Sequence, residues 1–277
     1  MVMFAPDLRP DSSLVAEVRP SPNHGERKGR GVVDMLLLHY TGVPDDKVAI
    51  NHLCNPGSKV SAHYVVLPDG AVIQLVAEAR RAWHAGLGSW GSDTDINSCS
   101  VGIELANPGH EHGYPAFPKR QIAATIALSR SIFARHRIPP HHVLAHSDVA
   151  PARKQDPGEK FPWHLLAASG IGLWVKPARI GREGPIYSLG ETNPAIEETQ
   201  RLLAQYGYLV PVSGYFDGVT RAVVAAFQRH FRPQRVDGSI DVSTVATLKA
   251  LLAARDAWLR ENEQASATPA PAPPEQA

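Results

Sequence analysis

A proline-interrupted segment near the middle of the chain contains side chains that could bind a metal ion. His146 offers imidazole nitrogens, Asp156 offers carboxylate oxygens, and Lys154 lies between them. Pro151 and Pro157 disfavour a regular helix or strand here, so groups that are separated in sequence can converge on one point. A catalytic zinc ion is typically held by three nitrogen or oxygen ligands and keeps one position open for water. The segment could therefore supply two ligands of such a site.

A third ligand could come from the end of an apolar run. Residues 32–38 are apolar except for one aspartate, and His39 follows them just before Thr41 and Gly42 break the run. A short run of this kind predicts a buried strand, with His39 at its exit on the rim of a sheet. A histidine at the end of a strand can equally be a hydrogen-bonded surface residue, and the run alone leaves both interpretations open.

Glu104 is a candidate for acid-base chemistry. Val101, Ile103 and Leu105 alternate with small or polar residues, which is the period of a half-buried strand. Glu104 then lies on the face opposite the core together with Gly102, which we expect to leave room beside the carboxylate. The side chain could act as a general base, or it could simply face solvent as a strand carboxylate.

The elements that position these residues follow from the pattern of apolar residues. Two apolar runs, 64–67 and 71–75, flank a turn at 68–70 and predict a hairpin. Residues 119–135 predict a helix with an apolar face. Together with the strands that end at His39 and contain Glu104, they predict an α/β fold with a mixed central sheet flanked by helices.

Blocks of sequence in a fixed order resemble the zinc-dependent N-acetylmuramoyl-L-alanine amidases, the family of the AmpD and AmiD amidases and related phage lysozymes. The blocks read LHYT at 38–41, VSAHY at 60–64, RAWHAG at 81–86, SVGIEL at 100–105 and HSDVAPARKQDPG at 146–158. An ordered set is far more specific than any one short motif. The resemblance covers residues 20–175 and implies hydrolysis of the amide bond between N-acetylmuramic acid, or its 1,6-anhydro form, and L-alanine.

Carried over position by position, the resemblance places the zinc ligands on His39, His146 and Asp156. It places catalysis on Glu104, as general base and then acid, and on Lys154, as the cation that stabilises the oxyanion. The chemistry needs these roles, because an amide is a poor electrophile with a poor leaving group. A zinc ion can activate water and polarise the carbonyl.

Substrate contacts are predicted in and near the RAWHAG block. Trp83 offers an aromatic face to a sugar, although tryptophans also pack in protein cores. Arg81 and Asn97 could hydrogen-bond peptide or carboxylate groups, and His84 could line the cleft.

Two further residues are expected to support the site rather than react. His63, like His84, is predicted to line the cleft or to hydrogen-bond a metal ligand. Asp148 is predicted to cap a turn or to orient a ligand.

Composition is typical of a globular enzyme. With 277 residues and 43% hydrophobic content the chain can form one large core and one smaller core, and a net charge of +1 gives no bulk attraction to nucleic acid. No apolar run approaches the roughly 20 residues of a membrane helix. Cys54 and Cys99 match no paired zinc motif and do not establish a disulfide. We expect a monomer whose partners are peptidoglycan or anhydromuropeptides.

The chain beyond the amidase-like region predicts a second, helical domain. Three segments carry apolar residues at helical spacing, at 196–206, 224–231 and 245–252. Residues 186–254 resemble the small peptidoglycan-binding module of many cell-wall hydrolases, which implies a three-helix domain that holds the enzyme on wall material. The predicted division is an N-terminal arm (1–22), a catalytic domain (23–175), a linker (176–190), a three-helix domain (191–255) and a disordered tail (264–277).

The predicted activity and the predicted cellular location each have an alternative interpretation. A non-catalytic muropeptide receptor could use the same fold, although it would have no chemical need for the three metal ligands together with Glu104 and Lys154. The apolar start at residues 1–5 is cut short by Pro6 and Asp7, whereas a secretory signal needs a longer apolar core. We therefore expect a cytoplasmic enzyme. The wall-binding module favours the periplasm or cell envelope instead.

Overall fold

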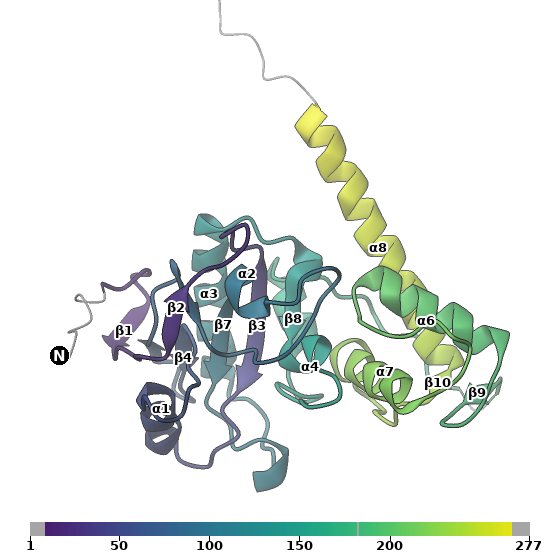
Figure 1. Cartoon of the computed structure of the whole chain (residues 1–277), viewed down its shortest axis with the longest axis horizontal. Coiled ribbons are helices and arrows are strands. Elements are labelled where there is room, and N and C mark those ends of the chain that lie inside the picture. The colour runs from purple at the N-terminus through teal and green to yellow at the C-terminus, as the bar shows by residue number, and fades with distance from the viewer. Residues whose placement is uncertain (1–8, 182, 268–277) are drawn as a thin grey trace, which may run out of the picture.

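The computed structural model describes residues 9–181 and 183–267 and shows an N-terminal α/β unit beside a C-terminal helical unit (Figure 1). The α/β unit is built on a six-stranded sheet in the order β1-β5-β4-β7-β3-β8. All neighbouring strands are parallel except β4 and β5, so the predicted mixed sheet is confirmed. The strands are β1 (Val15–Val18), β3 (Met35–Tyr40), β4 (Tyr64–Val66), β5 (Val72–Gln74), β7 (Ser100–Leu105) and β8 (Val143–Ala145).

The centre of the sheet is formed by the two strands that carry candidate site residues. The apolar residues of β3 are fully buried, as expected for a parallel strand covered on both faces. In the parallel pair β3–β7, His39 lies directly opposite Glu104. The register of this pair therefore sets the relative position of a candidate metal ligand and the candidate base.

Helices and a small two-stranded sheet surround the central sheet (Figure 1). The predicted helix at 119–135 is observed with the same bounds. The surrounding elements are β2 (His24–Glu26), α1 (Asp46–Cys54), β6 (Arg80–Ala82), α2 (Ile96–Cys99), η1 (His110–His112), α3 (Lys119–Arg135), η2 (Pro140–His142), α4 (His146–Val149) and α5 (Trp163–Ala168).

Part of the predicted N-terminal arm belongs to the sheet. Strand β1 pairs in parallel with β5, at the edge of the sheet. Polar contacts hold the segment that leads into β1, because the Asp11 backbone donates to Gln74 Oε1 at 2.9 Å and the Asp11 carboxylate accepts from the Glu78 backbone at 2.8 Å. These contacts involve residues more than sixty positions apart, so local sequence composition could not indicate them.

The predicted three-helix unit is observed as α6 (Pro194–Tyr206), α7 (Gly218–Phe231) and α8 (Val242–Ala267). The predicted linker is partly structured, since β9 (Ile186–Tyr187) pairs with β10 (Ile240–Asp241). Helix α8 continues to Ala267, so the tail predicted from residue 264 begins inside this helix, and residues 268–277 lie outside the described part. No helix in the described ranges has the length and apolarity required to cross a membrane.

The two units share a hydrophobic core. Trp90 packs against Tyr206 and Tyr208, with ring centroids 5.7 and 4.9 Å apart. Gly207 is required at this contact, because a Cβ atom there would lie 2.5 Å from the Trp90 ring. The Gly91 N–H also donates to the Gly207 carbonyl at 2.8 Å. The C-terminal unit is therefore docked rather than merely tethered.

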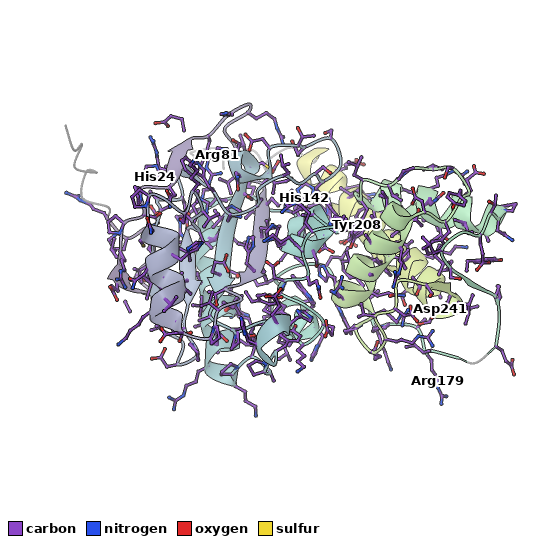
Figure 2. All side chains as sticks on the ribbon, turned by 60° about the horizontal axis from the view of Figure 1, so that its bottom comes forward. His24, Arg81, His142, Arg179, Tyr208 and Asp241 are labelled. Atoms are coloured by element: carbon purple, nitrogen blue, oxygen red, sulfur yellow. The ribbon has the colours of Figure 1, made fainter. Side chains whose placement is uncertain are left out.

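Asp148 supplies the polar part of this junction. Its buried carboxylate accepts hydrogen bonds from the Tyr208 hydroxyl and from His230 Nδ1, each at 2.6 Å, and Figure 2 shows Tyr208 where the two units meet. The same carboxylate accepts from the Ala145 backbone at 2.8 Å, which confirms the predicted turn-capping role. One side chain of α4 thus fixes the adjacent turn and the second unit together.

We expect Tyr208→Phe to lower the free energy of unfolding by about 1–3 kcal/mol, because it leaves a buried carboxylate with one donor fewer. Urea unfolding followed by circular dichroism measures the change. The exposed Tyr215 on the same unit provides the matched control, Tyr215→Phe. Equal losses in both variants would contradict a contribution from the Asp148 contact.

Glu78 forms a second buried polar cluster, which attaches the end of α3 to the sheet. Its carboxylate accepts from Tyr64 at 2.5 Å, from Arg135 at 2.6 Å and from His136 at 2.7 Å. Burial alone would raise the pKa of Glu78, but the hydrogen bonds from Arg135, His136 and Tyr64 lower it to about 2. The folded state therefore prefers the ionised form more strongly than the unfolded chain does.

A group with a depressed pKa stabilises the fold above its unfolded pKa of about 4.3, and this contribution is lost as the pH falls through the folded value. The stability difference between wild type and Glu78→Gln should therefore shrink as the pH falls from about 4.3 toward about 2. Urea midpoints across this range measure it, with the exposed Glu17→Gln as control. A difference that is independent of pH would refute this account of Glu78.

Candidate active site

Three predicted ligands meet at the carboxyl ends of neighbouring parallel strands. His39 lies near the end of β3, and His146 is the first residue after β8. Because β3 and β8 pair in parallel, their carboxyl ends adjoin. Asp156 follows in the loop after α4, where the Ser147 N–H donates to the Asp156 carbonyl at 3.0 Å and closes the loop. The proline-interrupted segment thus brings two donors to one point.

The donor atoms of these residues are close enough to share one ion. His39 Nδ1 and His146 Nδ1 are 2.9 Å apart, and Asp156 Oδ2 lies 3.2 Å from the first and 2.9 Å from the second. Tetrahedral coordination at about 2.0–2.2 Å separates ligand atoms by about 3.3–3.5 Å, so the group needs little adjustment. All three residues are buried. This buried group could hold a metal ion.

The far nitrogens of both imidazoles are already hydrogen-bonded. His146 Nε2 donates to the Ala85 carbonyl at 3.0 Å. His39 Nε2 lies 3.1 Å from His84 Nδ1, and His84 Nε2 lies 3.2 Å from the Ser100 hydroxyl, which itself donates to a backbone carbonyl. This pattern assigns the proton to Nε2 in each imidazole and leaves the Nδ1 lone pairs of His39 and His146 facing the shared point.

Gly102 makes room for His84 rather than for Glu104. A Cβ atom at Gly102 would lie 2.5 Å from the His84 ring, so the expectation that this glycine serves the carboxylate is corrected. The Gly102 N–H also donates to His63 Nδ1 at 3.0 Å. Burial lowers the pKa of His63 to about 3 and that of His84 well below its ordinary value, so both rings are neutral.

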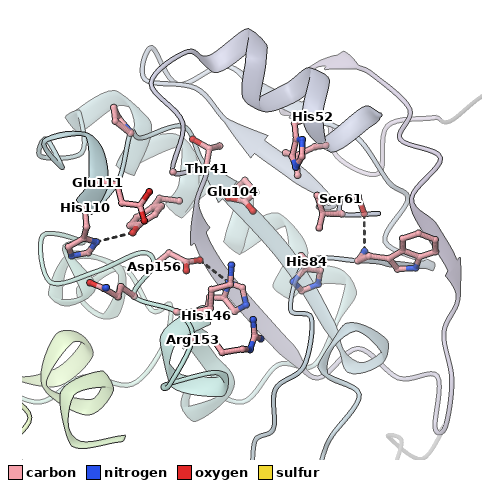
Figure 3. A pocket seen from close by; sticks show the side chains of 18 residues that line it. Thr41, His52, Ser61, His84, Glu104, His110, Glu111, His146, Arg153 and Asp156 are labelled. Carbon is pink, nitrogen blue, oxygen red and sulfur yellow. Dashed lines mark hydrogen bonds and ion pairs between the residues drawn. The ribbon is translucent and has the colours of Figure 1, made fainter. Parts of the chain in front are cut away.

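A cavity of about 400 Å³ opens beside the three donors (Figure 3). Glu104 and Lys154, the predicted catalytic residues, both line it, as do Trp83 and His84. The predicted pairing of a carboxylate and a lysine next to the metal-binding group is therefore present in one cavity.

Glu104 faces this cavity with unused hydrogen-bonding capacity. Its Oε2 atom is buried and has no hydrogen-bond partner among the described residues. Burial and then the charge of Asp156 raise the pKa of Glu104 well above its ordinary value, while Lys154 opposes the shift. A carboxyl group in this environment can exchange a proton with a bound molecule.

Two predicted substrate contacts lie outside this cavity. Asn97 is buried, and its Oδ1 accepts from the backbones of His84 and Ala85 at 3.0 and 2.8 Å. It thereby positions the loop that supports both candidate histidine ligands. Arg81 forms an ion pair with Asp95 at 2.6 Å. His63 is not among the residues that line the cavity, and its ring packs edge-on against His84 with the ring centroids 5.5 Å apart.

The opposite wall contains residues that the sequence did not single out. The Tyr40 hydroxyl lies 2.9 Å from His110 Nδ1, and His110 Nε2 lies 3.1 Å from Glu159. Gly109 allows this packing, since a Cβ atom there would lie 2.5 Å from the Tyr40 ring. Tyr40 falls within the LHYT block, but the loop around His110 has no periodic pattern that could have indicated its place.

Comparisons with known proteins agree with this geometry. A family profile for N-acetylmuramoyl-L-alanine amidases matches residues 29–159. AmiD of Escherichia coli K12, an N-acetylmuramoyl-L-alanine amidase, is 38% identical over 235 residues, which cover 79% of this chain and 82% of AmiD. The chain belongs to this amidase family. The predicted enzyme class is thereby confirmed.

Solved structures extend the similarity to both units of the amidase. Escherichia coli AmiD is similar with a TM-score of 0.67 and 35% identity, over 82% of this chain and 92% of that one. AmpDh3 of Pseudomonas aeruginosa is similar with a TM-score of 0.65 and 31% identity, over 84% and 94%. A profile for putative peptidoglycan binding domains matches residues 192–248, within the predicted three-helix domain.

We expect His84→Phe to weaken metal binding by about 10- to 100-fold, because the ring is retained beside Gly102 while the partner of His39 Nε2 is lost. Titration against a chromogenic chelator measures the dissociation constant. The exposed His112→Gln is the control. Unchanged affinity in His84→Phe, with an intact circular dichroism spectrum, would contradict the role assigned to His84.

Proposed function

We propose that this amidase hydrolyses the bond between N-acetylmuramic acid, or its 1,6-anhydro form, and the L-alanine of a stem peptide, with zinc held by His39, His146 and Asp156. The observation that carries the proposal is one cavity in which three buried donors converge beside the unpartnered Oε2 of Glu104. AmpD of Citrobacter freundii, 29% identical to this chain, is a 1,6-anhydro-N-acetylmuramyl-L-alanine amidase. The Escherichia coli AmiD structure holds the substrate anhydro-N-acetylmuramic acid-L-Ala-D-γ-Glu-L-Lys.

The donor set suits zinc in particular. Two imidazole nitrogens and one carboxylate oxygen form a set typical of catalytic zinc, and the hydrogen bonds on the far nitrogens fix both rings. When bound, zinc would supply a Lewis acid that polarises the scissile carbonyl and promotes ionisation of water.

Glu104 and Lys154 would perform the proton transfer and the charge stabilisation. The Glu104 carboxylate takes a proton from the attacking water and later delivers it to the departing amine of L-alanine, so the carboxylate is restored in each cycle. Lys154, whose side chain has no hydrogen bond or ion pair within the described ranges, offers its ammonium group to the oxyanion of the tetrahedral intermediate.

The saccharide would occupy the aromatic end of the cavity. Trp83 lines this end with Leu53 and Val60, and its backbone is fixed by the Ser61 hydroxyl at 2.8 Å. Figure 3 shows Ser61 and His52 on one side of the metal-binding group and His110 and Glu111 on the other. A sugar ring can stack on the indole while the scissile amide lies over the three donors.

The C-terminal unit would keep the enzyme on peptidoglycan fragments. Association through a second site raises the effective concentration of the next scissile bond, without any change at the metal site. The cytoplasmic location stays a prediction, with the periplasm as its alternative, and cell fractionation tests it.

We expect Glu104→Gln to lower kcat by about 10²- to 10⁴-fold, because the amide keeps the size of the side chain but cannot accept the proton. Mass spectrometry of products from a defined anhydromuropeptide, with zinc-loaded protein, measures release of the peptide that begins with L-alanine. The exposed Glu183→Gln is the control.

Free peptide made by the wild type and nearly absent with Glu104→Gln would support the proposal. Cleavage within the peptide would give a different product mass and would refute the assigned bond. Retained substrate binding without any cleavage by metal-loaded wild type would exclude the proposed reaction.

A further inference from the structure

A second cavity of about 400 Å³ lies between the two units. The α/β unit contributes residues 151–155, which form the loop between α4 and Asp156. The C-terminal unit contributes residues of α7 at the spacing of one helix face. These residues are Gly218, Arg221, Ala222, Ala225 and Arg229.

The wall of this interdomain cavity is strongly basic. Four of its residues are cationic, Arg153, Lys154, Arg221 and Arg229, against one acid, Asp237. Asp237 is already paired with Arg235 at 3.0 Å. The cavity therefore presents an excess of positive charge that its own residues do not neutralise.

The two arginines of α7 are available to a ligand. Neither Arg221 nor Arg229 has a hydrogen bond or ion pair within the described residues, whereas Arg153 donates to the carbonyls of Ala85 and Leu87. Arg229 is half-buried, whereas Arg221 is exposed at the rim of the cavity. An arginine that is partly withdrawn from water and has no acceptor gains most from an anionic partner, and a carboxylate matches its planar fork of donors.

The interdomain cavity adjoins the catalytic cavity across one loop. Arg153, Lys154 and Gln155 line both. Figure 3 shows a helix of the C-terminal unit on the side of His110 and Glu111, away from Ser61. A ligand with its sugar at the aromatic end would therefore extend its peptide toward α7.

The junction between the units holds this cavity in a fixed shape. His230, next to Arg229 on α7, bonds the buried Asp148 carboxylate at 2.6 Å and stacks on Trp163 with ring centroids 3.7 Å apart. Asp148 belongs to α4, immediately before the loop that forms the other wall. Both basic walls are thus anchored to the same buried contact.

The proposed substrate has the complementary charge. A γ-linked glutamate leaves its α-carboxylate free, and the last residue of the peptide adds a second carboxylate. Each residue beyond L-alanine extends the peptide by about 3.3–3.6 Å. The peptide would run from the metal-binding group along the shared wall 153–155 toward α7.

We propose that the interdomain cavity binds the free carboxylates of the stem peptide through Arg221 and Arg229, so that the C-terminal unit forms a peptide subsite of the active site. This inference rests on the proposed amidase function. It assigns to the second unit a direct contact with the same substrate molecule that is cleaved, in addition to its attachment to peptidoglycan.

The test compares wild type, Arg221→Gln/Arg229→Gln and the control Arg201→Gln, in which an exposed arginine of α6 is replaced. The substrates are anhydro-N-acetylmuramic acid-L-Ala-D-γ-Glu-L-Lys and the same compound with its carboxylates converted to carboxamides. We expect the double variant to raise KM for the acidic substrate about tenfold or more, with kcat unchanged, because charge-assisted hydrogen bonds are lost. On the amidated substrate it should match wild type, and Arg221→Lys/Arg229→Lys should recover part of the acidic preference.

An unchanged KM in the double variant would overturn the subsite, and so would equal losses on both substrates. Calorimetry of the acidic compound binding to Glu104→Gln protein, with and without replacement of Arg221 and Arg229, tests the subsite independently of the proposed reaction. Hydrolysis of neither substrate by wild type would refute the reaction, while weaker binding of the acidic compound after replacement of Arg221 and Arg229 would still support the subsite.

Discussion

The buried negative charge of Asp156 must be balanced by positive charge within the same site. Burial alone would raise the pKa of Asp156, but the adjacent imidazoles of His146 and His39 hold it below its ordinary value. Burial, followed by the nearby His146, lowers the pKa of His39 to about 4, so this imidazole is neutral at neutral pH. Glu104 adds a second carboxyl group to the same cavity, and Lys154 is one cation. A divalent ion at the three donors would balance both carboxylates, since a bound metal is the largest local charge in such a site.

The fold brings these charged and metal-binding groups together at the carboxyl edge of a parallel sheet. Strands β3 and β8 deliver the two histidines side by side, and the register of β3 with β7 sets Glu104 opposite His39. Because these strands are buried on both faces, a register shift would move each side chain to the other face and disrupt the packing on both sides of the sheet, so it is strongly disfavoured. The positions of the candidate base and the candidate ligands are therefore fixed by the same packing that stabilises the core.

The sequence predicts which residues converge, the three candidate ligands and the candidate catalytic pair, because each lies within a short block of characteristic order. The spacing of apolar residues likewise predicts the bounds of α3 and the presence of three C-terminal helices. It could not predict contacts between distant segments. Gly102 was assigned to the neighbouring carboxylate, whereas its actual constraint is the His84 ring, eighteen positions earlier in the chain.

Other missed features have the same physical origin. Asn97 was predicted to contact substrate from its residue type, but its side chain satisfies two backbone donors of the loop that supports the ligands. Strand β1 pairs with β5, and the segment before it is held by polar contacts of Asp11 with distant residues, so local composition does not indicate this strand. The sequence predicts a turn-capping role for Asp148, but its bonds to Tyr208 and His230 depend on the docking of a unit about sixty or more residues away in the chain.

The coupling of the two units follows from the position of Asp148 between His146 and the loop that carries Lys154. A module that served only to tether the enzyme would need no fixed orientation, because a flexible linker already raises the effective concentration. Here, separation of the units would leave a buried carboxylate without two of its donors, which is costly. The second unit therefore stays docked, and the loop of Lys154 remains held between the metal-binding group and α7. Docking at this place makes the helical unit part of the wall that surrounds the substrate, and its arginines face the cavity into which a stem peptide would extend.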